Sequence, residues 1–343
     1  MANPRVDQNL RALVRGAYAI QKLRIQFGNR LVNKWKADRG MVPGKKESET
    51  MSAKDKMILD KIGKAYGVMT DGLMKFPNEK GFMGNEIISE YSFLCLVSEY
   101  MELREFEEVH FKRFLPFLKK YSFYTEWLQK VKGVGPKMAA VILCEFDVHK
   151  AKYASSFRKY AGLDVGPDGA GRSMRKEHLV EVEYVDKNGA VSTRDSITYN
   201  PFVKTKLMGV CADCLIRSGN RKYYPMYLNY KNRLENHPEF GKKMDGKKDK
   251  YGMRVSPIRR HTMAKRYIIQ QFLIDLFLAW KEHEGLEIPQ DYAVTKLGIV
   301  HAPTDPNDKF STLSAKEREA IKSDYGDMPV DPSVLEELEE IVA

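Results

Sequence analysis

The chain has 343 residues, of which 43% are hydrophobic, and it carries a formal net charge of +11 at pH 7. This length leaves room for two or three compact units, each with a real core. The best candidate for a membrane span, residues 272–280, is too short and is interrupted by Asp275. The N-terminus also lacks the apolar core of a signal peptide. We therefore expect no membrane partner, reduced cysteines and a cytoplasmic, nucleoid-associated location.

Charge is distributed unevenly along the chain. Residues 304–343 contain 4 basic and 11 acidic residues, so this part carries −7 while the rest carries +18. A basic body with an acidic tail is typical of nucleic-acid-binding proteins. A generic basic protein with a solvated tail has the same charges, so charge alone leaves the function open.

The N-terminal third predicts helices only. Apolar residues recur at three- and four-residue steps over 8–38, which predicts one long amphipathic helix. Its basic face includes Arg11, Arg15, Arg24 and Arg30. Further helices are expected over 53–73, 85–102 and 104–120. A long apolar stripe needs a partner surface, so we expect a homo-oligomer, although the chain's own body could also cover the stripe.

Residues 127–146 predict a helix-hairpin-helix, a unit that grips the sugar-phosphate backbone of nucleic acids. Two glycines in the turn allow backbone angles that are closed to other residues, and their amides can form an anion-binding nest. Pro136 suits the first position of the second helix, whose positive end attracts phosphate. The residues expected to bind are Lys132, Gly133, Val134, Gly135 and Lys137. The alternative is a turn that only packs.

The body after the hairpin predicts one β-hairpin among helices. The expected elements are a helix over 150–164, a glycine-rich loop over 165–173, strands over 177–184 and 191–199 around an Asn-Gly turn, a helix over 201–217, a basic linker over 239–256 and a helix over 260–284. We therefore predict a mainly α fold. Its parts are a helical arm or bundle (1–121), a helix-hairpin-helix domain with an inserted β-hairpin at about 177–199 (122–300) and an acidic tail (301–343).

These motifs resemble the bridge-RNA-guided insertion-sequence transposases, which join an acidic RuvC-like nuclease domain, a helical arm and a helix-hairpin-helix transposase domain. Residues 132–140 are similar to the family's Gly-(Ile/Val)-Gly-x-x-x-Ala signature, and Tyr160-Ala-Gly-Leu163 is similar to its continuation. The arm and the segment 261–269 resemble the family's arginine-rich and closing helices. The resemblance covers most of residues 8–285 and implies DNA as a partner, with a structured RNA as a second one.

Two departures from that family bear on catalysis. The arm begins within ten residues of the N-terminus, so we expect the acidic nuclease site to be absent, with no metal site and no cofactor unless a partner supplies a Mg²⁺-dependent nuclease. The family's serine nucleophile follows the Tyr-Ala-Gly-Leu phrase, where alignment on Gly171 places Ala170. Ser173 is then the nearest hydroxyl, and Arg172 could stabilise charge on the attacked phosphate. A serine beside glycine is also a common turn residue.

Three functions remain open from the sequence. The leading hypothesis is a DNA-binding protein of transposase ancestry that acts in recombination or transposition through its hairpin. The second is an active serine-dependent recombinase or transposase. The third is an RNA-binding scaffold that uses the arginine face of the first helix.

Overall fold

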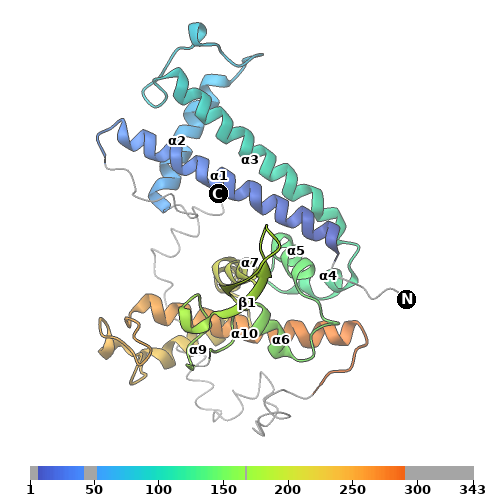
Figure 1. Cartoon of the computed structure of the whole chain (residues 1–343). Helices are drawn as coiled ribbons and strands as arrows, with labels where there is room; N and C mark the ends of the chain where they lie inside the picture. The colour runs from blue at the N-terminus through green and yellow to red at the C-terminus, as the bar shows by residue number, and fades with distance from the viewer. Residues whose placement is uncertain (1–6, 42–51, 167, 290–343) are drawn as a thin grey trace. The chain divides into compact units, whose positions relative to one another are not determined.

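The predicted N-terminal helix forms as one element, α1 (Gln8–Ala37). Asp7 caps it, since its carboxylate accepts the main-chain N–H groups of Asn9 and Leu10 at 2.9 and 3.0 Å. α1 runs beside α3 (Tyr91–Leu118), and α2 (Ala53–Thr70) packs against both (Figure 1). This computed structural model describes residues 7–41, 52–166 and 168–289.

Helix α3 corrects one prediction, because the two helices expected over 85–102 and 104–120 are a single helix that begins at Tyr91. No glycine or proline interrupts the chain between 91 and 115, so nothing ends the helix before Pro116 in its last turn. Residues ahead of it form a loop, in which the side chain of Asn85 accepts the N–H groups of Ile87 and Ile88.

The helical arm contributes to two separate cores. The smaller core lies among the C-terminal half of α1, α2 and the N-terminal half of α3, around Leu31, Ile62 and Leu94. The larger core takes Val14 from α1 and Phe114 from α3 and continues through the body of the protein. The apolar stripe of α1 is therefore covered by its own chain in both halves. Homo-oligomerisation stays a prediction.

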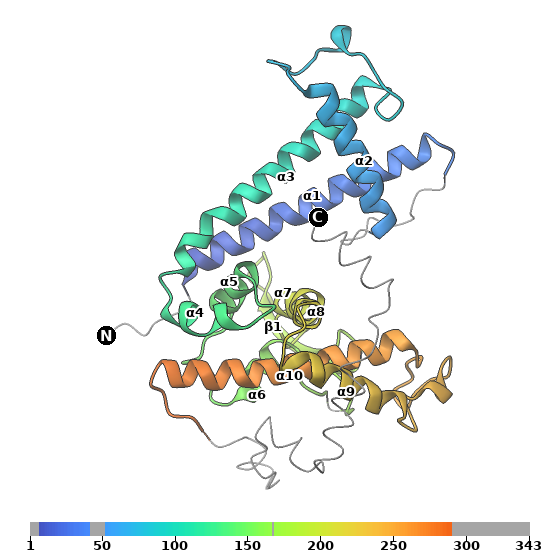
Figure 2. The same cartoon turned by 180° about the vertical axis from the view of Figure 1, so that it is seen from behind.

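The body of the protein is a set of short helices around the long helix α10 (Figure 2). Its helices are α4 (Ser122–Glu126), α5 (Pro136–Glu145), α6 (Ala154–Tyr160), α7 (Pro201–Lys206), α8 (Ala212–Arg217), α9 (Tyr223–Glu235) and α10 (Pro257–His283). Short turns of helix join them: η2 (Leu128–Lys130), η3 (Lys176–His178), the π-helical turn η4 (Leu207–Cys211) that links α7 to α8, and η5 (Lys242–Met244), while η1 (Glu79–Gly81) lies in the arm. The mainly α fold is confirmed.

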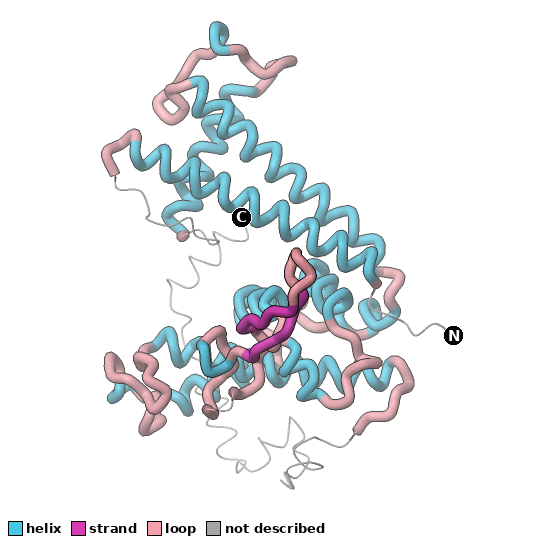
Figure 3. The backbone as a smooth tube through the Cα atoms, in the orientation of Figure 1, coloured by secondary structure: helices cyan, strands magenta, loops and turns pink. Residues whose placement is uncertain are grey.

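The predicted β-hairpin is also confirmed. β1 (Val180–Val185) pairs antiparallel with β2 (Val191–Ser196), from Val180 opposite Ser196 to Val185 opposite Val191 (Figure 3). Gly189 adopts φ +82° in the turn, which explains the glycine there.

The lysine-rich segment expected as a linker is folded onto the body. Phe240 and Val255 are buried in it, and the buried carboxylate of Asp249 accepts the N–H groups of Tyr251 and Met253. Asp249 also pairs with Arg259 in the first turn of α10. The apolar and acidic residues between the lysines hold this segment on the body, so the lysines themselves lie on its exposed side.

The predicted acidic tail, 301–343, lies outside the described residues. Within the described part, no helix combines the length and apolar character that a bilayer span requires.

Candidate nucleic-acid interface and serine loop

The helix-hairpin-helix sequence folds as a short first helix, a tight turn and a buried second helix. α4 and η2 precede the turn, and α5 follows it. Val134 anchors the turn: its side chain is buried, and its N–H donates to the carbonyl of Val131 at 2.9 Å. α5 is buried from Met138 to Glu145, so only its first residues reach the surface.

The two glycines of the turn have different roles. Gly133 adopts φ +97°, and a Cβ there would lie 2.8 Å from the carbonyl oxygen of Cys214 in α8. Gly135 has an ordinary φ of −75°, with no neighbouring atom within 4 Å of such a Cβ. The predicted need for unusual backbone angles is therefore right for Gly133 and wrong for Gly135.

The start of α5 is open to an anion. Gly135, Pro136 and Lys137 are exposed, and no side chain caps the helix. Within the described residues, the N–H groups of Gly135 and Lys137 donate no hydrogen bond to another group. Two main-chain donors therefore face outward at the positive end of a ten-residue helix.

A second feature of the hairpin is a cluster of basic residues in the turn that precedes α5, in a cavity that also contains Asp275 and Glu282 of α10. The turn and the loop before α9 line a cavity of about 570 Å³ that includes Lys130, Lys132 and Arg221. None of the three forms an ion pair within the described residues, whereas Lys222 in the same cavity pairs with Asp275 at 2.8 Å. Lys137 lies over the ring of Phe111 at 3.9 Å from its centroid. The hairpin pattern in the sequence predicts Lys132 and Lys137 as binding residues, and the fold adds Arg221 from a distant segment.

Two arginines of the predicted binding face lie against a buried acid instead. Arg11 and Arg15 approach the carboxylate of Glu145 at 3.2 and 2.6 Å, and the Glu145 side chain is fully buried. Tyr160 and Asn200 also donate to this carboxylate, at 3.2 and 2.8 Å. These contacts tie the arm to the end of α5 and offset the two positive charges.

The other two arginines are also engaged within the chain. Arg24 pairs with the buried carboxylate of Glu107 and reaches the hydroxyl of Tyr100 at 3.3 Å. Arg30 lies over the ring of Phe27. The arm arginines thus make structural contacts that the helical pattern could not reveal, since the acids that pair with Arg11, Arg15 and Arg24 lie on other helices. Their role in binding stays a prediction.

The glycine-rich loop brings three side chains into a serine–histidine–aspartate arrangement. Ser173 Oγ lies 3.1 Å from His178 Nδ1, and His178 Nε2 lies 2.9 Å from Asp168 Oδ1. The side chain of His178 is fully buried. The hydrogen bond from His178, together with the N–H of Ala170, holds the pKa of Asp168 at about 2.

The hydrogen bonds define the tautomer of His178. The main-chain N–H of Ser173 donates to Nδ1 at 2.9 Å, so Nδ1 is an acceptor and Nε2 carries the proton that Asp168 accepts. The Ser173 hydroxyl lies 3.1 Å from the same Nδ1, so the main-chain N–H and the hydroxyl compete for its single lone pair. The hydroxyl can pass its proton to Nδ1 only when the N–H releases that lone pair.

Arg175, rather than Arg172, is the cation at the serine. Arg175 Nε donates to Ser173 Oγ at 3.2 Å, and Arg175 pairs with Asp168 at 2.7 Å. Arg172 pairs instead with Asp164 at 2.7 Å. Ala170 is buried in the turn. The sequence did not single out Asp168, Arg175 or His178, because only the folded loop brings them to Ser173.

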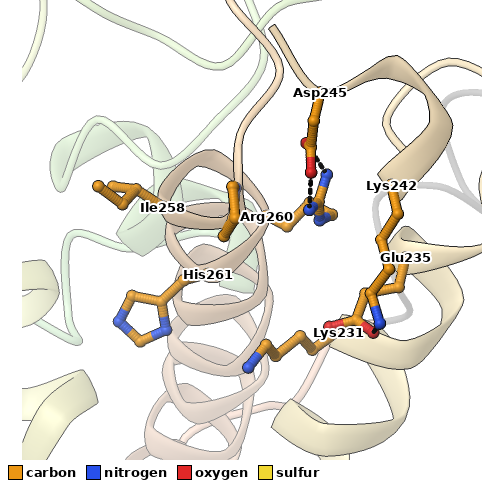
Figure 4. Close-up of a pocket in the computed structure, with 8 residues that line it drawn as sticks. Lys231, Glu235, Lys242, Asp245, Ile258, Arg260 and His261 are labelled. Atoms are coloured by element: carbon orange, nitrogen blue, oxygen red, sulfur yellow. Dashed lines mark hydrogen bonds and ion pairs between the residues drawn. The ribbon is translucent and has the colours of Figure 1, made fainter.

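A separate cavity of about 490 Å³ lies between α9, η5 and the start of α10 (Figure 4). Two of the three Lys and Arg side chains in its lining are paired within the chain: Arg260 binds Asp245 with two hydrogen bonds of 2.6 and 3.0 Å, and Lys242 pairs with Glu235 at 2.6 Å. Among the described residues, no group of three or more His, Cys, Asp or Glu side chains is placed to hold a metal.

Comparison with known proteins finds one match. Residues 125–181 match the family model described as Transposase IS116/IS110/IS902 family, a range that contains both the hairpin and the serine loop. No curated protein and no solved structure matches the chain. The match supports a transposase-like protein, on the segment where the two candidate sites lie.

Proposed function

We propose that this protein binds DNA through the sugar-phosphate backbone at its hairpin and acts in recombination or transposition. The observation that carries the proposal is the hairpin itself. It has two free N–H groups at the exposed start of α5, and its turn lines a cavity with Lys130, Lys132 and Arg221, which form no ion pair within the described residues. The transposase match over the same segment agrees with it.

Binding of this kind has a recognisable signature. Main-chain amides and lysines contact phosphates and do not read bases, so affinity depends little on sequence. Each phosphate contact releases counterions, so the logarithm of the binding constant falls with the logarithm of salt concentration by about 0.9 per contact.

The test is binding of a fluorescent duplex DNA, by anisotropy at two salt concentrations. Gly135→Val covers the free amides without backbone strain, because Gly135 has an ordinary φ and open space around it. We expect about tenfold weaker binding, as for the loss of a hydrogen bond to a charged group. Lys132→Gln should weaken binding and also reduce the salt slope by about 1.

Lys64→Gln is the matched control, since Lys64 is exposed on α2, in the arm. It should retain native affinity. Native affinity in both Gly135→Val and Lys132→Gln would show that the hairpin does not bind DNA.

The second candidate function is serine-dependent strand transfer, which the contact between Ser173 and His178 favours. Ser173 Oγ would attack a phosphodiester phosphorus while its proton passes to His178 Nδ1. A phosphoserine ester forms, the bond to one sugar oxygen breaks, and that oxygen takes the proton from the imidazolium. Arg175 is the cation within reach of the attacked phosphate.

A DNA substrate with a bridging phosphorothiolate tests this chemistry, because the released thiol cannot reverse the step. A covalent protein–DNA adduct is expected for the native protein and for Ser196→Ala, and none for Ser173→Ala. If the native protein forms no adduct, even with RNA added, the candidate is wrong. The RNA-scaffold hypothesis rests on the arginine face of α1, where Arg11, Arg15 and Arg24 contact acids of their own chain.

A further inference from the structure

A cavity of about 670 Å³ lies between the glycine loop, α9 and the first half of α10. It is lined by three arginines and no acidic side chain. This composition differs from that of the cavity in Figure 4, where Glu235 and Asp245 pair with Lys242 and Arg260. In the part of the chain that the structure describes, only Arg259 of the three arginines is paired with an acid, Asp249, and the remaining positive charge of this concave site favours an anionic ligand.

The environment of Arg266 is the strongest indication that this cavity binds an anion. Its guanidinium lies against the glycine loop, so closely that a Cβ on Gly171 would be 2.8 Å from Arg266 Cζ. Arg266 Nη1 is buried without a hydrogen-bond partner, and within the described residues Arg266 forms no ion pair. Burial lowers the pKa of this guanidinium. A buried guanidinium N–H without a hydrogen-bond partner is costly, and a bound anion would supply that partner.

The other two arginines complete a cationic wall. Arg254 is exposed at the cavity and forms no ion pair within the described residues. Arg259 is held in place by the buried carboxylate of Asp249, while its Nε is buried without a partner. One arginine is thus fixed by the protein, and two have donors free for a ligand.

The same cavity presents flat aromatic surfaces. Tyr230 of α9 and Tyr267 of α10 stack with ring centroids 4.3 Å apart and planes within 7°. Tyr251 lines the cavity beside Gly169. Stacked rings next to arginines bind nucleobases, whose faces stack on aromatic side chains irrespective of sequence.

We propose that this cavity binds one nucleotide, with its phosphate at Arg254 and Arg266 and its base against the tyrosines. The volume is in the range of small-molecule sites. The inference goes beyond the hairpin and does not depend on it, since the two sites share no residue. The nucleotide could be free or a unit of a single strand, and both carry the same phosphate and base.

The test is calorimetric titration of the full-length chain with adenosine 5′-monophosphate, adenosine and a short single-stranded oligodeoxyadenylate. We expect the monophosphate to bind and adenosine to bind at least tenfold more weakly. Arg254→Gln and Arg266→Met should each weaken the phosphorylated ligands by about tenfold or more, since each removes charged hydrogen bonds. Arg233→Gln, an exposed arginine of α9 outside the cavity, should bind as the native protein does.

Two further measurements distinguish a ligand-binding role of Arg266 from a structural role and from binding at the hairpin. Arg266→Met should melt no lower than the native protein in the absence of ligand, whereas a purely structural arginine would lower the melting temperature when removed. Gly135→Val should bind the monophosphate as the native protein does. A failure of the hairpin proposal can therefore be distinguished from a failure of the nucleotide-site proposal. Binding of the oligonucleotide alone, weakened by both arginine variants, would identify the single strand as the source. If both variants bind both ligands as the native protein does, or if nothing binds, the proposal is overturned.

Discussion

Asn220 donates its side-chain amide to the main-chain carbonyl of Lys132 at 2.7 Å. The same side chain accepts the N–H groups of Lys222 and Tyr223 at 3.0 and 3.1 Å, at the start of α9. One buried asparagine thus joins the hairpin to a second turn that is 88 residues away in sequence. Lys132 and Arg221 share one surface because of this contact.

Asn220→Ala should therefore loosen both turns together. The variant leaves buried donors and an acceptor without partners, and we expect a loss of about 1–3 kcal/mol in the free energy of unfolding. Chemical denaturation measures this loss, and duplex DNA binding should weaken in the same variant. Native stability would mean that the two turns hold their positions without the asparagine.

Gly133→Ala and Gly135→Ala should differ sharply in stability. At Gly133, alanine combines a positive φ with a contact of 2.8 Å to the backbone of α8, and we expect a loss of about 2–4 kcal/mol. At Gly135, alanine meets no atom within 4 Å and should cost less than about 1 kcal/mol. Thermal melts of the two variants compare their stabilities directly. Equal destabilisation would contradict the conclusion that only Gly133 requires a glycine for its backbone conformation.

Glu145→Gln should destabilise the joint between arm and body. The substitution keeps the shape of the side chain but leaves the charges of Arg11 and Arg15 without their buried partner. We expect a loss of about 3 kcal/mol, at the low end for a broken buried pair because both arginines are more than one third exposed. Urea unfolding is the measurement. Glu105→Gln, an exposed residue of α3, is the control and should change stability by less than about 0.5 kcal/mol.

Lys204 should make stability rise with pH in the alkaline range. Burial and the charge of Arg266 lower the pKa of Lys204 to about 8, from 10.5 in the unfolded chain. Between these values the unfolded state holds a proton that the folded state has released, so folding becomes more favourable as pH increases. The stability of the native protein relative to Lys204→Met should therefore grow between pH 7.5 and 10. A constant difference across this range would contradict the lowered pKa.

Most helices, the β-hairpin and the turn around Gly133 were predictable, because apolar periodicity and turn chemistry are local properties. Helix α9 was not predicted. The sequence analysis predicts two helices where the structure has the single helix α3. Apolar periodicity alone does not show whether a long helix continues or whether a second helix begins. The partners of Ser173 and of the arm arginines could not be predicted either. His178 and Glu145 act through contacts that exist only after the loop closes and the arm docks. Tyr223 and Tyr227 of α9 are buried in the larger core.

Helix α5 has a role that follows from what lies at its two ends. Its first residues carry the free amides, and its last residue, Glu145, holds Arg11 and Arg15 of α1. Helix α5, ten residues long, thus joins the free amides directly to α1, which packs along α3. If these amides bind the DNA backbone as proposed, a movement of α1 and α3 would be transmitted to that backbone through α5, without passing through any loop.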